Sequence, residues 1–356
     1  MTSTKPAWMP TVNSQDLDHI LNQTSSLWDE LSGQRVFISG GTGFFGHWIV
    51  ESLLWANDIL DLDVRIVLLS RNPDAFSNNY PQLAKHPAIS WIQGDVKSFE
   101  YPDGKFSYVI HAASEGNIKL AQENPLQVFN TIVDGTHHIL EFARTHKTKK
   151  LLFTSSGAVY GRQPPELTHV PENYIGAPEI MDQRSAYGEG KRAAELLCNL
   201  YSHQFGFQTK IARCFAFVGP HLPLNTNYAV GNFIRDALQG GPIRIMGDGT
   251  PYRSYLYSAD LTAWLWTILF NGQSCRPYNV GSEQAVSIKE LAEKVKEVIA
   301  PEAEIQVLQK EQPEEKKQRY VPSVERIKKE LGVISWTSLE PGIRKTFEWI
   351  KFRSEN

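Results

Sequence analysis

The chain has 356 residues, of which 41% are hydrophobic and 21% are charged, and its formal net charge at pH 7 is -3. These proportions are typical of a folded globular protein and exclude a disordered or fibrous chain. The length allows two or three domains, or one α/β domain with an appended lobe. The nearly balanced charge predicts no basic surface for nucleic acid or anionic lipid, so we expect a small-molecule partner.

The three cysteines, Cys198, Cys214 and Cys275, are far apart and lie in apolar segments, so we expect reduced core thiols. No cysteine or histidine spacing typical of a metal site is present. The chain also lacks the basic start and apolar run of a secretory leader, and no segment approaches the ~20 apolar residues of a membrane span. We therefore expect a soluble, cytoplasmic protein without a metal.

Residues 1–33 are polar apart from one amphipathic stretch that ends at Gly33, and we interpret them as an N-terminal arm packed on the main domain. The next segment, 36–46, has four residues of high strand propensity followed by Gly40, Gly43 and Gly46. An apolar helical pattern then runs over 47–55. A strand, a glycine turn and a helix start in this order are typical of a site for a dinucleotide diphosphate.

Strand and helix patterns then alternate, which predicts a doubly wound parallel sheet of the Rossmann type. After the first strand, further strands are predicted at 64–69, 89–92, 109–113, 150–155 and 210–215, and helices at 126–145 and from Ser185 to about residue 203. The segment 162–182 is rich in Pro, Glu and Asn, and we expect a long surface excursion there.

Beyond residue 218 the alternation decays, which predicts a smaller, irregular C-terminal lobe for substrate. We assign 34–218 to the dinucleotide-binding domain, 255–285 as a return to it, and 219–254 with 286–356 to the lobe. Helices are expected within the lobe at 232–239, 287–299 and 324–331. The chemistry should lie in the cleft above the carboxyl ends of the strands.

Three polar residues indicate a catalytic set. Tyr187 and Lys191 are four residues apart on one predicted helix, so their side chains share a face. An ammonium group beside a phenol lowers the pKa of the phenol, and a tyrosine that acts as a base near neutral pH needs such a lowered pKa. Ser156 stands where the fifth strand ends, and its hydroxyl can bond both a substrate oxygen and the phenol. Tyr101 and Lys105 have the same spacing, but a Pro-Asp-Gly turn separates them.

With these residues in this order, the chain resembles the NAD-dependent epimerase/dehydratase family, the extended short-chain dehydrogenase/reductases that act on nucleotide sugars. The resemblance covers about residues 34–350. It rests on ordered motifs: Gly-Gly-Thr-Gly-Phe-Phe-Gly at 40–46, Gly-Asp-Val at 94–96, His-Ala-Ala at 111–113, Ser-Ser at 155–156, Tyr-Gly-Glu-Gly-Lys at 187–191, Val-Gly-Pro at 218–220, Gly-Asp-Gly at 247–249 and Arg253 ahead of Tyr-Ser-Ala-Asp-Leu at 257–261.

The resemblance implies a role for each matching residue. Tyr187 would take a proton from a sugar hydroxyl while hydride leaves its carbon for the nicotinamide, Lys191 would hold the nicotinamide ribose, and Ser156 would orient the reacting oxygen. The residues implied to contact the cofactor are Gly40, Gly43, Phe44, Phe45, Gly46, Ser70, Arg71, Asp95, Val96, Ala112, Ala113, Tyr187 and Lys191. Those expected to contact the substrate are Ser114, Glu115, Ser156, Asn232 and Arg253.

The chain departs from the family in two ways that affect its chemistry. Dinucleotide folds that choose NAD usually place an acid after the second strand, where this chain has Ser70 and Arg71, so NAD is expected and NADP stays open. The family's dehydratases have Asp-Glu, and its decarboxylases keep a glutamate, where this chain has Gly157 and Ala158. Glu115 is an alternative carboxylate for either reaction.

We therefore expect an enzyme that oxidises a nucleotide-diphosphate sugar at C4 and then epimerises it or reduces a keto sugar, an isomerase or oxidoreductase rather than a lyase. The alternatives are a decarboxylase or 4,6-dehydratase with a displaced acid such as Glu115, and, in another class, a non-catalytic NAD(P)-binding regulator. By resemblance, a homodimer would form through the helices at 126–145 and 185–203.

Overall fold

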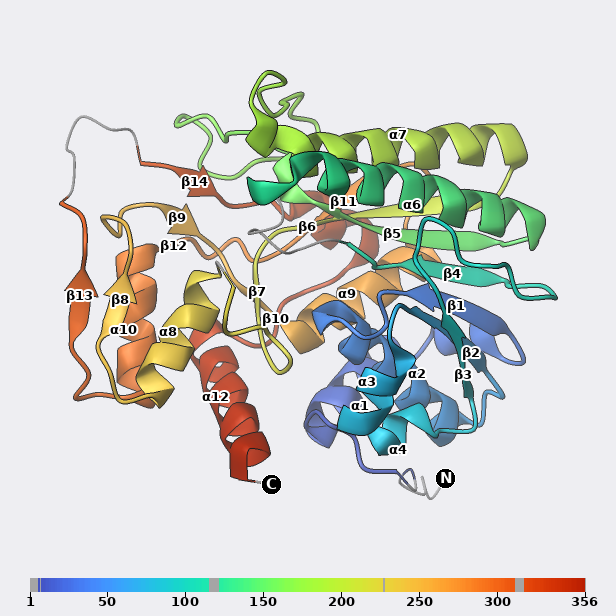
Figure 1. Ribbon diagram of the computed structural model, residues 1–356, viewed down its shortest axis with the longest axis horizontal. Helices are drawn as coiled ribbons and strands as arrows, with labels where there is room; N and C mark the ends of the chain where they lie inside the picture. The colour runs from blue at the N-terminus through green and yellow to red at the C-terminus, as the bar shows by residue number, and fades with distance from the viewer. Residues whose placement is uncertain (1–5, 7, 115–121, 227, 311–316, 356) are drawn as a thin grey trace.

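The computed structural model describes residues 6, 8–114, 122–226, 228–310 and 317–355. Its centre is a seven-stranded parallel sheet with the strand order β11-β6-β5-β4-β1-β2-β3 (Figure 1). The strands span Pro277–Val280 (β11), Gln208–Cys214 (β6), Lys150–Ser156 (β5), Tyr108–His111 (β4), Arg35–Ser39 (β1), Arg65–Ser70 (β2) and Ile89–Gln93 (β3). The order reverses between β1 and β4, which opens a crevice at the carboxyl ends of these strands. The predicted Rossmann-type α/β fold is confirmed.

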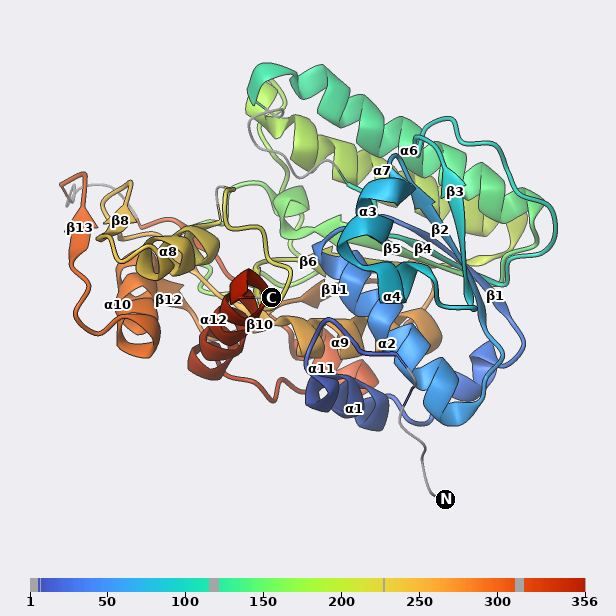
Figure 2. The ribbon, with the colours of Figure 1, turned by 60° about the horizontal axis from the view of Figure 1, so that its bottom comes forward.

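Helices cover both faces of this sheet, as Figures 1 and 2 show from two directions. The pair on one face is Pro125–Thr145 (α6) and Ala186–Phe205 (α7). The opposite face carries Ser14–Gln23 (α1), Phe44–Leu60 (α2) and Ser258–Asn271 (α9). Short helices connect the remaining segments: Trp28–Leu31 (η1), Pro73–Asn79 (α3), Pro81–Ala84 (α4), Gly157–Tyr160 (η2) and Gln183–Ser185 (η3).

Two apolar cores follow from the alternation of side chains along the strands. Phe37 of β1 packs against Phe142 of α6, with ring centroids 4.5 Å apart, whereas its neighbour Ile38 lies in the core that α2 and α9 cover. All three residues are fully buried. Because both faces of the sheet are covered, the strands read as nearly continuous apolar runs, which is why they could be predicted within two residues at most ends.

The C-terminal part forms a lobe to one side of the sheet (Figure 1, left). Three small sheets and four helices build most of it: Phe217–Val218 (β7), Ala229–Leu238 (α8), Ile243–Ile245 (β8), Tyr252–Arg253 (β9), Leu256–Tyr257 (β10), Val286–Ser287 (β12), Ile288–Ile299 (α10), Ile305–Val307 (β13), Arg319–Tyr320 (β14), Glu325–Leu331 (α11) and Leu339–Glu355 (α12). The sequence did not predict α12, because its buried side is a narrow stripe that includes Leu339, Ile343 and Thr346. Among the described residues, no helix is long and apolar enough to cross a membrane.

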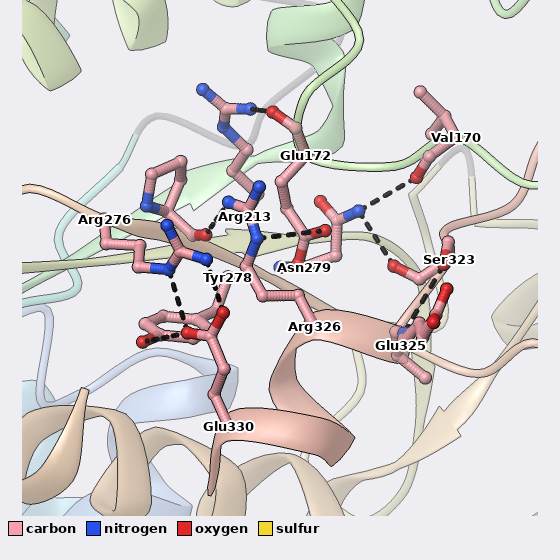
Figure 3. Close-up of polar contacts among 12 residues, drawn as sticks. Val170, Glu172, Arg213, Arg276, Tyr278, Asn279, Ser323, Glu325, Arg326 and Glu330 are labelled. Carbon is pink, nitrogen blue, oxygen red and sulfur yellow. Dashed lines mark hydrogen bonds and ion pairs between the residues drawn. The ribbon is translucent and has the colours of Figure 1, made fainter. Parts of the chain in front are cut away.

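A polar network fastens α11 and the segment before it to the edge of the main sheet (Figure 3). The side-chain amide of Asn279, fully buried on β11, donates to the carbonyl oxygens of Val170 at 2.9 Å and Ser323 at 3.0 Å. Nearby, the guanidinium of Arg276 donates to Glu330 of α11 at 2.8 Å. The excursion at 162–182 and the segment before α11 are therefore held side by side on one strand.

The N-terminal arm joins the two parts of the molecule through Asp16 on α1. The buried carboxylate of Asp16 accepts a hydrogen bond of 2.7 Å from the hydroxyl of Tyr257 and forms an ion pair with Lys345 of α12. In addition, the indole of Trp349 on α12 donates to the carbonyl oxygen of Thr11 at 2.6 Å. The arm is thus an integral part of the packing between α12 and the sheet.

We predict that Asp16→Ala lowers the free energy of unfolding by about 2–3 kcal/mol, because it leaves the buried Tyr257 hydroxyl and the Lys345 ammonium without their acceptor. Urea denaturation measures this change. The exposed Asp29 provides the matched control, and we expect Asp29→Ala to cost less than about 0.5 kcal/mol. Equal losses in the two variants would contradict the anchoring role of Asp16.

Candidate active site

The glycine turn after β1 is shaped by two close backbone contacts. Gly40 has φ +77°, and a Cβ there would lie 2.5 Å from the carbonyl carbon of Ala112 at the end of β4. A Cβ on Gly46 would lie 2.1 Å from the carbonyl oxygen of Gly40, so the helix α2 packs directly on the turn. A Cβ on Gly43, the N-cap residue of α2, would meet no protein atom closer than 3.5 Å. Two of the glycines are therefore required by the fold, and the third keeps the helix N-terminus open to a ligand.

A pocket of about 470 Å³ opens beside this turn at the carboxyl ends of β1, β2 and β4. It is lined by many of the residues predicted for the cofactor, together with one predicted for the substrate: Gly40, Gly43, Ser70, Arg71, Asp95, Val96, Ala112, Ala113 and Ser114. Phe44 and Phe45 instead pack against the core, where the Phe45 ring lies 5.1 Å from that of Phe217. The pocket lies at the N-terminus of α2 and beside a turn whose glycines leave room for a ligand. These features fit a dinucleotide.

His111 holds the floor of this pocket in place. Its Nδ1 lies 2.7 Å from the Ser39 hydroxyl on β1, and its Nε2 lies 3.1 Å from the Thr136 hydroxyl on α6. Burial lowers the pKa of His111 to about 3, so the imidazole is neutral and serves as a bridge between two strands and a helix. This bridge positions Ala112 and Ala113 along the pocket.

Ser156, Tyr187 and Lys191 meet where β5 ends and α7 begins. The ammonium group of Lys191 is buried, donates to the Thr154 carbonyl oxygen at 2.8 Å and lies 5.9 Å from the centre of the Tyr187 ring. The side chains of Ser156 and Ser114 lie close enough to the Tyr187 phenol to lower its pKa. The structure thus brings the three predicted catalytic residues together and adds Ser114 to them.

Burial governs the pKa values of this set, and the predicted lowering of the Tyr187 pKa by Lys191 does not prevail against it. Burial raises the pKa of Tyr187 to about 12, against the lowering effect of the hydroxyls of Ser156 and Ser114. Burial also lowers the pKa of Lys191 to about 8, which leaves the ammonium mostly protonated at neutral pH. For Tyr187 to act as a base near neutrality, a positive charge on the ligand has to favour its phenolate.

Of the residues predicted to contact the substrate, Ser114 and Ser156 lie at the edge of the main sheet, and Arg253 and Asn232 lie on the lobe. Arg253 lies on β9, where its guanidinium carbon is 5.9 Å from the ring centre of Tyr320. Asn232 lies on α8, and its amide oxygen accepts a hydrogen bond of 3.3 Å from Arg235. Glu115 lies outside the described residues. Sequence reasoning missed Tyr320, whose hydroxyl is 3.5 Å from that of Ser156, because Tyr320 directly follows a charged run at 310–319 that has no helix or strand pattern.

Beneath the turn, His47, Glu51 and His221 form a buried cluster whose ligand-type atoms lie within 4.8 Å of one another. The two imidazole rings are stacked, with centroids 3.8 Å apart and an angle of 10° between their planes, so their lone pairs do not converge on one ion. The Glu51 carboxylate accepts hydrogen bonds from the backbone N–H groups of Thr11 at 2.7 Å and Val12 at 3.3 Å. We therefore assign the cluster to anchoring the N-terminal arm.

The sequence profile of the NAD dependent epimerase/dehydratase family matches residues 36–281 of the chain. Among curated relatives, UDP-glucuronic acid decarboxylase 5 of Arabidopsis thaliana is 32% identical over 315 residues, which are 88% of each chain. UDP-glucuronic acid decarboxylase 1 of Xenopus tropicalis is 30% identical over 327 residues, which are 92% of this chain and 74% of the relative.

Solved structures of the same fold include UDP-glucose 4-epimerase of Thermotoga maritima, with a TM-score of 0.76 and 19% identity, over 90% of this chain and 100% of that one. Another is dTDP-glucose 4,6-dehydratase of Bacillus anthracis in complex with NAD, with a TM-score of 0.73 and 20% identity, over 90% of this chain and 98% of that one. At these identities the likeness concerns the fold.

The different surroundings of Gly46 and Gly43 lead to a prediction that separates an effect on folding from an effect on cofactor binding. Gly46→Ala should lower the melting temperature by several degrees or prevent folding, because its Cβ would collide with the Gly40 carbonyl. Gly43→Ala should keep the wild-type melting temperature and weaken NAD binding about tenfold or more, because the methyl group faces the ligand. Thermal unfolding and calorimetric titration with NAD measure the two effects, and wild-type affinity in Gly43→Ala would contradict this placement of the diphosphate.

Proposed function

Because the chain belongs to the NAD-dependent epimerase/dehydratase family, we propose that it is an NAD-dependent enzyme that oxidises C4 of a UDP-linked sugar. The observation that carries this proposal is the meeting of Ser156, Tyr187 and Lys191 beside a pocket that fits a dinucleotide. Membership in this enzyme family also speaks against the non-catalytic regulator as an explanation of the chain.

In the proposed reaction the chain's own residues handle the proton. The Tyr187 phenolate accepts the proton of the C4 hydroxyl, and the Ser156 hydroxyl orients the phenolate oxygen that receives it. Lys191 supplies a fixed positive charge close to the phenol and is oriented by the Thr154 carbonyl. NAD held beside the glycine turn would supply the acceptor for the hydride that leaves C4 and a positive charge that favours the Tyr187 phenolate.

For the step after oxidation, we propose decarboxylation of UDP-glucuronate. Its support is the identity of 29–32% to UDP-glucuronic acid decarboxylases over at least 87% of this chain. Chemistry supports it too, because a ketone at C4 is β to the C5 carboxylate. Loss of carbon dioxide would leave an enolate, and a proton taken up at C5 would restore the C4 ketone. Return of the hydride to C4, with the Tyr187 proton going to the C4 oxygen, would then complete the cycle.

Epimerisation at C4 or reduction of a keto sugar, which the sequence favoured, is the second candidate. It is supported by Gly157 and Ala158, which offer no carboxylate where β5 ends. Dehydration or decarboxylation through Glu115 depends on a residue outside the described ones. The cytoplasmic location and the choice of NAD over NADP beside Arg71 also stay predictions, and mass spectrometry of the cofactor released from denatured protein tests the latter.

We predict that the purified enzyme converts UDP-glucuronate to a UDP-pentose with release of one carbon dioxide. Incubation with UDP-glucuronate, UDP-glucose and UDP-N-acetylglucosamine, followed by mass spectrometry and chromatography of the products, tests this. A product of unchanged mass and altered retention would favour the epimerase instead.

Tyr187→Phe should lower turnover of the accepted sugar by roughly 10²–10⁴-fold, because the ring remains but the proton acceptor is lost. Tyr101→Phe is the matched control, since the Tyr101 hydroxyl donates to the His138 carbonyl oxygen at 2.9 Å and touches none of the site residues named above. Full turnover in Tyr187→Phe would exclude the proposed role of the phenol.

We also propose a homodimer through α6 and α7, supported by Leu126, Leu196 and Leu200, which are 68%, 57% and 52% exposed. A hollow of about 920 Å³ between these helices includes the first two. Light scattering should give twice the chain mass. Leu196→Glu should shift it toward the monomer, and the control Ile334→Glu, at a residue that is 50% exposed elsewhere, should not. A monomer at all concentrations would contradict the dimer.

A further inference from the structure

Tyr320, at the end of β14 in the C-terminal lobe, reaches the residues proposed for catalysis at the edge of the main sheet. Its hydroxyl lies 3.5 Å from Oγ of Ser156, although the two residues are 164 positions apart in the chain. The space for this hydroxyl exists because residue 157 is a glycine, since a Cβ on Gly157 would lie 2.7 Å from the Tyr320 oxygen. The phenol therefore occupies a place beside the end of β5 that a side chain at residue 157 would otherwise take.

Neighbouring contacts hold the Tyr320 ring and backbone in this position. Its ring packs on that of Phe215, with centroids 4.7 Å apart, and its strand β14 pairs with β9 so that Tyr320 is opposite Arg253. The next residue, Val321, donates its N–H to Gln163 at 3.0 Å. Two residues further on, Ser323 is bonded to the Asn279 amide on the sheet edge (Figure 3). Tyr320 is thus delivered to the site by a segment that is itself fastened to the sheet.

The hydrogen-bonding capacity of Ser156 shows what Tyr320 can do there. A serine hydroxyl has one proton to donate and two lone pairs that accept. One lone pair of Ser156 accepts the N–H of Ala158 at 3.1 Å. Burial raises the pKa of Tyr320, so this phenol keeps its proton and can donate to the second lone pair. With both lone pairs occupied, the serine proton is free to point toward the Tyr187 oxygen.

We propose that Tyr320 is a positioning residue of this site: its phenol donates to Ser156 and thereby commits the serine proton to the oxygen of Tyr187. The same committed proton stabilises the Tyr187 phenolate when that group acts as a base. The role rests on the proposed function only in taking Tyr187 as the base, because the contacts of Ser156 with Tyr320 and Ala158 belong to the protein without ligand. The titratable and charged groups that face Tyr187 and Tyr320 are Lys191, Cys214, Tyr228 and Arg253.

The test replaces the hydroxyl and keeps the ring. In Tyr320→Phe we expect kcat to fall about tenfold with KM changed less than threefold, and the acidic limb of the kcat pH profile to move up by about one pH unit, because the phenolate loses its committed donor. Tyr174→Phe serves as the control, since Tyr174 is a half-buried tyrosine whose ring lies against Tyr160. It should leave kcat and the pH profile unchanged.

A second variant keeps the Tyr320 hydroxyl but displaces it. Gly157→Ala places a methyl group 2.7 Å from that oxygen and equally close to the Phe215 ring on which Tyr320 packs. We expect the displaced phenol to reproduce the slower turnover and the shifted pH profile of Tyr320→Phe, with thermal unfolding as the check that the variant is folded. If Tyr320→Phe retains wild-type kcat and pH profile, the proposal is overturned. If only KM rises, Tyr320 contacts substrate and does not position Ser156, which overturns it as well.

A measurement without substrate separates this proposal from the proposed function. Nuclear magnetic resonance of tyrosine labelled at Cζ, with the Tyr187 signal assigned by Tyr187→Phe, follows the titration of this phenol in the unliganded enzyme. We expect the midpoint to move to higher pH in Tyr320→Phe even if no nucleotide sugar is turned over. An unchanged midpoint would overturn the proposal while leaving the proposed function intact.

Discussion

Parallel strand pairing is the constraint on which the site depends. Adjacent strands in register place Ser39 opposite His111, and Ser156 opposite Cys214, so that the polar residues that end these strands lie along one edge of the sheet. The backbone of that edge is close-packed, since Gly40 contacts Ala112 directly. The buried Lys191 ammonium donates a hydrogen bond to the Thr154 carbonyl oxygen near the end of β5. Cofactor pocket and proton-transfer residues are therefore parts of one rigid edge.

The lobe completes the site from the other side. Its small sheets contribute Arg253 and Tyr320 next to each other, and buried contacts through Asp16 and Asn279 hold the lobe to the main sheet. Because the lobe is fastened at several places that are far apart in the sequence, side chains on it can reach the end of β5 with defined geometry. Function is set by the residues of the site and not by the fold alone, and in this chain the lobe adds Arg253 and Tyr320 to the residues at the edge of the sheet.

The parts of the molecule that local pattern determines were predicted from the sequence. The strands are apolar because they are buried on both faces, and the glycine turn has a spacing that its packing requires. Ser156, Tyr187 and Lys191 could be selected because two share a helix face and one ends a strand. Tyr320 could not be selected. Its position depends on the pairing of β14 with β9 and on its close approach to Gly157, and both contacts join segments that are far apart in the sequence. The helix α12 was not predicted either, because its apolar stripe is too narrow to be recognised among the charged residues around it.

The central claim is that a hydride leaves C4 of the sugar, is held on the cofactor and returns within one catalytic cycle while Tyr187 handles the proton. The most direct test is turnover of the accepted UDP-sugar carrying deuterium at C4, with mass spectrometry of the product and absorbance of the reduced nicotinamide followed in a single turnover. The account predicts that the product retains deuterium at C4 and that a transient reduced cofactor forms more slowly than with the unlabelled sugar. Loss of the deuterium to water, or turnover without any reduced cofactor, would contradict it.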